Sequence, residues 1–147
     1  MKLVSACLLG VRCRWDGKRR ASKKVIKLSE KEILIPVCPE QLGGLPTPRV
    51  AQEIVGGSGG DVLDGRCIVL NREGEDVTGN FVRGAREVLR IARLLGVSVF
   101  IGKERSPSCA SRYIYDGSFK GKLAEGEGVT SALLRRNGID VLSDEDL

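Results

Sequence analysis

The chain has 147 residues, a length typical of one globular domain with its own hydrophobic core. Hydrophobic residues make up 41% and charged residues 29%, and the longest apolar runs are far shorter than a membrane span, which excludes disordered and membrane-spanning classes. Histidine is absent, so Cys/His zinc sites and Ser/His or Cys/His catalytic dyads are excluded as well.

The first third of the chain predicts two buried strands around a basic segment. An apolar run from Lys2 to Leu8 predicts the first strand, and Ile33 to Cys38 predicts the second. Between them we expect a helix from about Ser22 to Lys31. Residues 39–65 are dense in Gly and Pro and lack periodicity, so we expect a long functional loop there.

The middle of the chain carries the clearest helix signal. A strand over Arg66 to Leu70 is expected as an arm of an antiparallel hairpin that turns at residues 73–75. From about Gly79 to Leu95, apolar residues recur at helical spacing on one face. Thr78 or Asp76 is the expected N-cap and Gly96 the expected stop.

The last third predicts a strand, a second long loop, a helix and a closing strand. The strand covers Val97 to Ile101 and the loop covers residues 102–128. We expect the helix from about Val129 to Asn137 and the closing strand over Asp140 to Leu142. This alternation of helices and strands predicts one α/β domain over residues 1–147, with three layers, a mostly parallel sheet and a Rossmann-like outline.

Charge and termini bear on location and partners. The formal net charge is +5, and basic residues concentrate between Arg12 and Lys27. We interpret this run as a solvated loop and helix face, while binding of phosphate or RNA is the less favoured alternative. The N-terminus carries no signal-peptide pattern, so we expect a cytoplasmic protein without a membrane partner. The sequence does not specify an oligomeric state.

Three of the five cysteines follow predicted buried strands. Cys7, Cys38 and Cys109 each lie in a short stretch rich in Gly, Pro or Ser. In α/β sheets, the loops at the carboxyl ends of parallel strands gather at one place. These thiolates are therefore candidates to hold a soft metal or an iron–sulfur cluster. From the pattern alone, separate packing roles remain an equal alternative.

The other two cysteines and one carboxylate complete the candidate set. Cys67 lies inside a predicted strand, where core packing is the favoured role. Cys13 is interpreted as a loop residue, with a fourth metal ligand or a resolving thiol as alternatives. Glu40 follows Cys38 closely and is a candidate for moving protons, because the chain has no histidine.

A series of short motifs, in order along nearly the whole chain, resembles the thiouracil desulfidase family, formerly a family of unknown function. The motifs are Ser5-Ala6-Cys7-Leu8-Leu9-Gly10, Cys13-Arg14-Trp15-Asp16-Gly17, Pro36-Val37-Cys38-Pro39-Glu40, Gly43-Gly44-Leu45-Pro46-Thr47-Pro48-Arg49, Asp76-Val77-Thr78-Gly79, Lys103-Glu104-Arg105-Ser106-Pro107-Ser108-Cys109, Tyr115-Asp116-Gly117-Ser118-Phe119 and Gly126-Glu127-Gly128-Val129-Thr130.

The resemblance implies a [4Fe-4S] cluster bound by Cys7, Cys38 and Cys109, with the fourth iron open to the sulfur of a thiolated base. It implies a non-redox desulfuration of a thiolated nucleobase such as 2-thiouracil, with release of sulfide. Glu40 and Ser106 would be catalytic, Glu40 by handling protons and Ser106 by hydrogen bonding.

We further expect Arg49 and Ser108 to bind substrate, with pairing to a local carboxylate as the alternative role of Arg49. The chain departs from the family pattern at Ala110, where glycine is usual, and at Trp15, where tyrosine is more common. A left-handed backbone at Ala110 would be mildly strained. Cys13 is commonly apolar in the family, which disfavours a ligand role.

A competing hypothesis stays open beside this one. The chain would then be a zinc- or anion-binding module that contacts RNA through its basic segment. A steep salt dependence of RNA binding is the property that would distinguish this module from an enzyme acting on small molecules.

Overall fold

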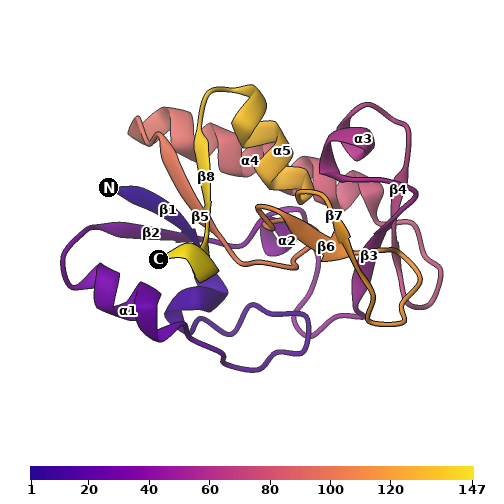
Figure 1. Ribbon diagram of the computed structural model, residues 1–147, viewed down its shortest axis with the longest axis horizontal. Coiled ribbons are helices and arrows are strands. Elements are labelled where there is room, and N and C mark those ends of the chain that lie inside the picture. The colour runs from indigo at the N-terminus through magenta and orange to yellow at the C-terminus, as the bar shows by residue number, and fades with distance from the viewer.

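Four parallel strands in the order β2-β1-β5-β8 form the central sheet (Figure 1). The computed structural model describes residues 1–147. The strands of this sheet are β1 (Lys2–Ser5), β2 (Leu34–Val37), β5 (Val99–Gly102) and β8 (Asp140–Ser143). All three pairings between neighbours are parallel, as the sequence predicted.

Helices cover both faces of this sheet. Leu3 and Phe100 pack with apolar residues of α4 (Thr78–Leu95) and α5 (Val129–Arg136). Val4 and Ile101, the next residues along the same strands, pack on the other face against α1 (Lys23–Ser29). Because successive side chains of a strand alternate between faces, each strand supplies both cores. The prediction of a three-layer α/β fold is confirmed.

Helix α4 begins and ends for identifiable reasons. At its end, Gly96 adopts a left-handed backbone (φ 64°) and its N–H bonds to Arg93, so the predicted stop is confirmed. At its start, the N-cap residue is Val77, so the expectation of Thr78 as the cap is wrong. Asp76 Oδ1 instead accepts the Thr78 N–H at 2.9 Å, which satisfies one free donor of the first turn.

The first strand is shorter than expected. It ends at Ser5, and residues Ala6–Leu9 form a 3-10 helix, η1. Gly10 terminates that turn with a left-handed backbone (φ 87°). Cys7 therefore lies in a turn beyond the strand and not at the end of the strand itself.

The long loop expected over residues 39–65 is wrong in part, because it contains three short elements. These are α2 (Pro39–Leu42), β3 (Gln52–Val55) and α3 (Gly59–Leu63). Helix α2 begins with Pro39 at its first position, where a missing N–H costs nothing. Helix α3 begins with a capping box formed by Ser58 and Asp61.

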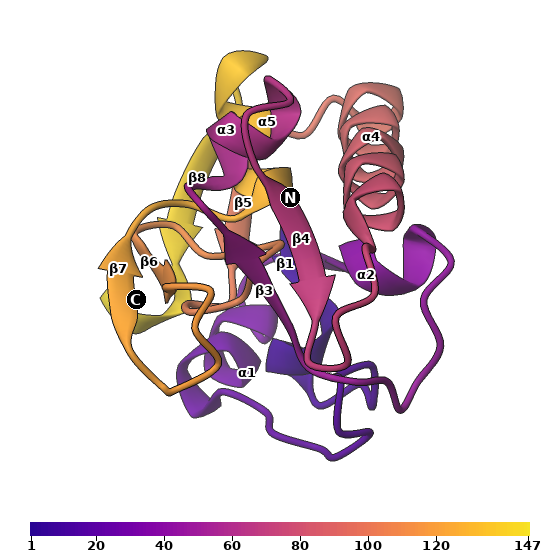
Figure 2. The same ribbon diagram turned by 90° about the vertical axis from the view of Figure 1, so that its right-hand side faces the viewer.

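Two small antiparallel sheets lie beside the central sheet (Figure 2). Strand β4 (Ile68–Asn71) pairs with β3. The segment after the turn at residues 73–75 forms only one antiparallel bridge with β4, between Leu70 and Asp76. The hairpin expected at that turn is therefore wrong in its partner strand. The second predicted loop, residues 102–128, also contains a hairpin.

Its strands are β6 (Tyr113–Tyr115) and β7 (Leu123–Glu125). The chain ends in a short 3-10 helix, η2 (Asp144–Asp146). No helix of the structure combines the length and apolar character that crossing a bilayer requires.

Candidate metal and active site

Adjacent strand ends place Cys7 and Cys38 on the same edge of the sheet. Ser5, the last residue of β1, pairs with Val37, the last residue of β2. Cys38 follows directly, as the N-cap of α2, and Cys7 follows two residues after Ser5 in η1. The parallel register therefore delivers both cysteines to the carboxyl edge.

Cys109 reaches the same edge from the loop after β5. Ser106 Oγ accepts backbone N–H groups from Ser108 (3.2 Å) and Cys109 (3.0 Å), which closes the Ser-Pro-Ser-Cys segment into a turn. Gly102 lies directly against this turn, since an added Cβ there would stand 1.9 Å from the Cys109 carbonyl oxygen. The Cys109 side chain is buried, and it lies close enough to Cys38 and Glu40 for their negative charge to raise its pKa.

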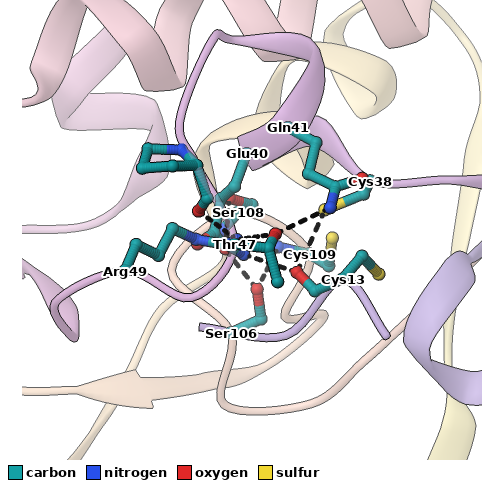
Figure 3. Close-up of polar contacts among 10 residues, drawn as sticks. Cys13, Cys38, Glu40, Gln41, Thr47, Arg49, Ser106, Ser108 and Cys109 are labelled. Carbon is teal, nitrogen blue, oxygen red and sulfur yellow. Dashed lines mark hydrogen bonds and ion pairs between the residues drawn. The ribbon is translucent and has the colours of Figure 1, made fainter. Parts of the chain in front are cut away.

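Cys13 lies together with the three predicted cysteines. The interpretation of Cys13 as a plain loop residue, which the sequence favoured, is therefore incomplete. Cys13 is 2% exposed, and its side chain contacts both Cys7 and Cys38. Its carbonyl oxygen accepts the Cys38 thiol (3.7 Å) and Arg49 Nη2 (2.8 Å), as Figure 3 shows. Only its spacing of six residues from Cys7 hinted at this position, because the path of the connecting loop has no periodic signal.

The environment raises the pKa of three of these thiols, those of Cys13, Cys38 and Cys109. Contact with the Cys13 thiol, followed by burial, raises the pKa of Cys38 far above its ordinary value. Burial is the main cause that raises the pKa of Cys109, against lowering contacts with the Ser5 and Ser106 hydroxyls. Contact with Cys38 lowers the pKa of Cys13, but Cys7 and burial outweigh it and raise that pKa to about 11.

Glu40 lies beside the thiols and has both oxygens occupied. Arg49 Nε donates to Oε1 at 2.9 Å, and Ser108 Oγ donates to Oε2 at 3.1 Å (Figure 3). Ser108 is 1% exposed, and the Arg49 and Glu40 side chains are 5% and 12% exposed. Two other segments of the chain, those of Arg49 and Ser108, thus hold this carboxylate close to Cys38.

Arg49 is anchored by more than Glu40. It also donates to the Pro46 carbonyl (3.1 Å), Thr47 Oγ1 (3.1 Å) and the Cys13 carbonyl (2.8 Å). These contacts match the alternative role, pairing with a local carboxylate. Contact of Arg49 or Ser108 with a substrate stays a prediction.

The donor set fits a soft metal centre by its chemistry. All five cysteines are free thiols, four of them meet at one edge of the sheet, and no histidine competes. Thiolates are the ligands that iron–sulfur clusters and soft metal ions prefer. No three acidic or cysteine side chains are already arranged around a common point, so binding requires the thiols to turn and lose their protons.

The remaining sequence candidates lie away from this edge or outside its chemistry. Cys67 packs in the separate core between α4 and the β3–β4 sheet, with its thiol 3.6 Å from the Ser58 carbonyl. Ala110 does not have the left-handed backbone that would strain it, and it is fully buried. Trp15 is 47% exposed, and only its carbonyl oxygen, which accepts the Arg49 N–H, takes part in the site.

The basic segment is exposed and partly paired within itself. Arg14 pairs with Asp16 at 3.1 Å, and Arg19 Nε donates to the Gly10 carbonyl at 3.0 Å. The segment leads into α1, whose lysines face solvent.

Comparison with known proteins identifies a family and a similar protein. The family model described as 2-thiouracil desulfurase matches residues 3–146. The uncharacterized protein YbbK of Bacillus subtilis (strain 168) is 46% identical over 147 residues, covering all of this chain and 97% of YbbK.

Among solved structures, the [4Fe-4S]-dependent thiouracil desulfidase TudS superposes with a TM-score of 0.86 at 41% identity. The match covers 99% of this chain and 91% of TudS. The family model matches almost every residue, and the identities extend over whole chains. The similarity therefore shows common family membership and not only a shared fold. The chain belongs to the 2-thiouracil desulfurase family.

Proposed function

We propose that this protein is a [4Fe-4S]-dependent desulfidase that removes sulfur from a thiolated nucleobase such as 2-thiouracil and releases sulfide. The observation that carries the proposal is the meeting of Cys7, Cys38 and Cys109 with Glu40 at one edge of the sheet. Family membership and the likeness to TudS support the same activity.

Cys7, Cys38 and Cys109 would hold the cluster as thiolates. A cubane cluster with three protein ligands supplies one iron with an open position, which suits a soft sulfur atom of a substrate. Cys13 is not required as a ligand in this assignment. The substrate base would therefore lie on the side of the thiols where Glu40 and Ser106 are found.

Glu40 is the group that handles protons. The overall reaction replaces C=S by C=O: water adds through its oxygen to the carbon that bears sulfur, the C–S bond breaks, and sulfur departs as sulfide. No electron is gained or lost. The Glu40 carboxylate accepts a proton from the attacking water, and its bonds to Arg49 and Ser108 keep it oriented for this role.

Two serines and Arg49 prepare the site around that carboxylate. Ser106 Oγ already accepts two backbone N–H groups, so its own proton is directed to the Cys109 sulfur or to a substrate. Ser108 spends its proton on Glu40, so a substrate contact would use its lone pairs. Arg49 would reach the substrate only through the Nη2 hydrogen that is not bonded to Cys13.

Anaerobic reconstitution with iron and sulfide, followed by an assay with 2-thiouracil, tests the proposal. We expect brown protein that produces uracil and sulfide in equal amounts. Cys67→Ser is the matched control, because Cys67 packs in the other core and should leave product formation unchanged. A protein that binds the cluster but forms no uracil would contradict the proposed reaction with 2-thiouracil.

The zinc-binding alternative predicts a different outcome of the same experiment. Colourless protein that retains zinc and takes up no iron would favour it. Binding of a single-stranded RNA that weakens steeply with salt would then assign the basic segment to RNA.

A further inference from the structure

Four cysteine thiols, those of Cys7, Cys13, Cys38 and Cys109, lie at this edge of the sheet, and Cys13 is the one without a role in the proposed reaction. It is as buried as a core residue, yet it packs against two other thiols and not only against apolar side chains. The Cys38 thiol points at the backbone of Cys13, 3.7 Å from its carbonyl oxygen. Figure 3 shows the two residues approaching from different segments of the chain.

We propose that Cys13 and Cys38 form a reversible intramolecular disulfide when the protein holds no cluster. The proposal rests on the proposed function in one respect, the placement of Cys38 among the cluster ligands. With the cluster bound, Cys38 is engaged as a ligand and the bond cannot form. Without it, the bond withdraws a ligand, so that cluster assembly becomes dependent on a thiol reductant.

The contacts favour Cys38 over Cys7 as the partner. Arg49 anchors the carbonyl of Cys13 at 2.8 Å and binds Glu40, which lies two residues after Cys38. The two cysteines are therefore held together by three contacts: thiol to thiol, thiol to carbonyl, and the bridge through Arg49. Cys7 shares only a side-chain contact with Cys13.

Cys109 is a poorer partner for either thiol. It is 4% exposed, and its turn is held from both sides, by Gly102 of β5 and by Gly128 before α5. Cys38 influences the Cys109 thiol through charge, without a direct side-chain contact. Forming a disulfide from this position would require its backbone turn to move.

The reaction balances with a small disulfide such as oxidised glutathione as the oxidant. The Cys38 thiolate attacks one glutathione sulfur, the glutathione S–S bond breaks, and one glutathione thiolate leaves. The Cys13 thiolate then attacks Cys38 Sγ of the mixed disulfide and releases the second glutathione. Two protein thiols are oxidised and two glutathione molecules form.

Formation of this bond would also protect the site. Peroxide oxidises a free cysteine through sulfenic acid to sulfinic and sulfonic acids, which a thiol reductant does not restore, whereas a dithiol reductant restores a disulfide. An enzyme that loses its cluster in air would then keep an intact ligand set for reassembly.

Peptide mapping tests the proposal directly. Cluster-free protein, prepared with an iron chelator, is incubated with excess oxidised glutathione at pH 8.5, alkylated under denaturing conditions and digested with trypsin. Cleavage after Lys2, Arg12, Arg14, Lys31, Arg49, Arg66, Arg72, Arg105 and Arg112 places each cysteine in a separate peptide. We expect residues 13–14 linked to residues 32–49, with Cys7, Cys67 and Cys109 alkylated.

Two variants sharpen the result. Cys67→Ala should form the same link, because Cys67 belongs to the other core. Cys13→Ala should show no link between protein cysteines and should carry glutathione at Cys38. Absence of the link in the wild type, or a link of Cys7 to Cys13 or to Cys38, overturns the proposal.

Iron content separates this inference from the proposed function. The oxidised wild type, reconstituted without a thiol reductant, should bind at least tenfold less iron than the same sample treated with dithiothreitol. If the reduced protein binds no cluster but the link forms, the proposed function fails while the disulfide stands. If the reduced protein binds a cluster and no link forms, the inference fails alone.

Discussion

Glu40 and Arg49 form a nearly buried ion pair, with Nε 2.9 Å from Oε1, at the point where the loop after α2 returns to the thiol cluster. The pair connects the proposed proton carrier to the carbonyl of Cys13 through the same guanidinium. Charge, orientation and loop path at the site thus depend on one arginine.

Replacing Arg49 should cost stability as well as activity. Arg49→Met leaves the Glu40 carboxylate buried without its partner, and we expect a loss of about 3–5 kcal/mol in the free energy of unfolding. Urea unfolding of the cluster-free protein measures this. Arg136→Met, which removes the exposed pair with Asp64, is the control and should lose far less. Equal losses in the two variants would contradict a special role for the buried pair.

Glu40→Gln should separate chemistry from cluster binding. The amide keeps the shape of the side chain but cannot accept a proton from water, so turnover of 2-thiouracil should fall by about 100-fold or more. Iron and sulfide counts should stay at wild-type level, because Glu40 is not a proposed ligand. A variant that desulfurates at the wild-type rate would show that another group moves the proton.

Gly102→Ala should displace the turn that carries Cys109. The added Cβ would stand 1.9 Å from the Cys109 carbonyl oxygen and 3.1 Å from the Phe100 ring, so the turn that carries Cys109 must shift. We expect lower iron content and a loss of about 1–3 kcal/mol in stability. Gly79→Ala is the matched control, because nothing lies within 4 Å of its Cβ. There we expect a gain of about 0.5–1 kcal/mol, since alanine favours the helix.

Glu104 should make stability depend on acid pH. Burial raises the pKa of Glu104. The Ser143 hydroxyl and the backbone N–H groups of Tyr113 and Arg112 together lower this pKa by more than burial raises it, so the pKa lies below its usual value. Oε1 accepts those N–H groups at 2.8 and 2.9 Å, while Oε2 has no hydrogen bond within normal distance. The stabilisation is therefore complete above the unfolded-state pKa and disappears as pH falls through the folded-state pKa.

Unfolding of the cluster-free wild type and Glu104→Gln over a pH series checks this. The two proteins should differ most in stability near neutral pH, with the wild type more stable. The difference should shrink as the pH falls below the ordinary glutamate range. A difference that is constant with pH would mean that the ionised carboxylate contributes nothing.

Elements with a strong local pattern were predictable from the sequence. Helix α4 has an apolar face over five turns and a glycine stop, and the strands of the central sheet are short apolar runs. The same apolar runs also placed Cys7, Cys38 and Cys109 in the segments after β1, β2 and β5. Both signals depend on residues close together in the chain.

Elements that depend on distant partners were missed. Strand β3 owes its conformation to pairing with β4, and the hairpin β6–β7 lies in a segment with only three residues a strand. Likewise, the convergence of Cys13 and the pair Glu40–Arg49 arise where loops fold back on the sheet edge. No periodicity encodes such returns, so residue types alone could not assign Cys13 to the site.

The ligand assignment is the central claim, and iron and acid-labile sulfide counts on the five single Cys→Ser variants after anaerobic reconstitution test it most directly. We expect Cys7→Ser, Cys38→Ser and Cys109→Ser to lose the cluster, and Cys13→Ser and Cys67→Ser to retain about four irons and four sulfides per chain. Full cluster content in any of the first three variants would contradict the account, as would loss of the cluster in Cys13→Ser.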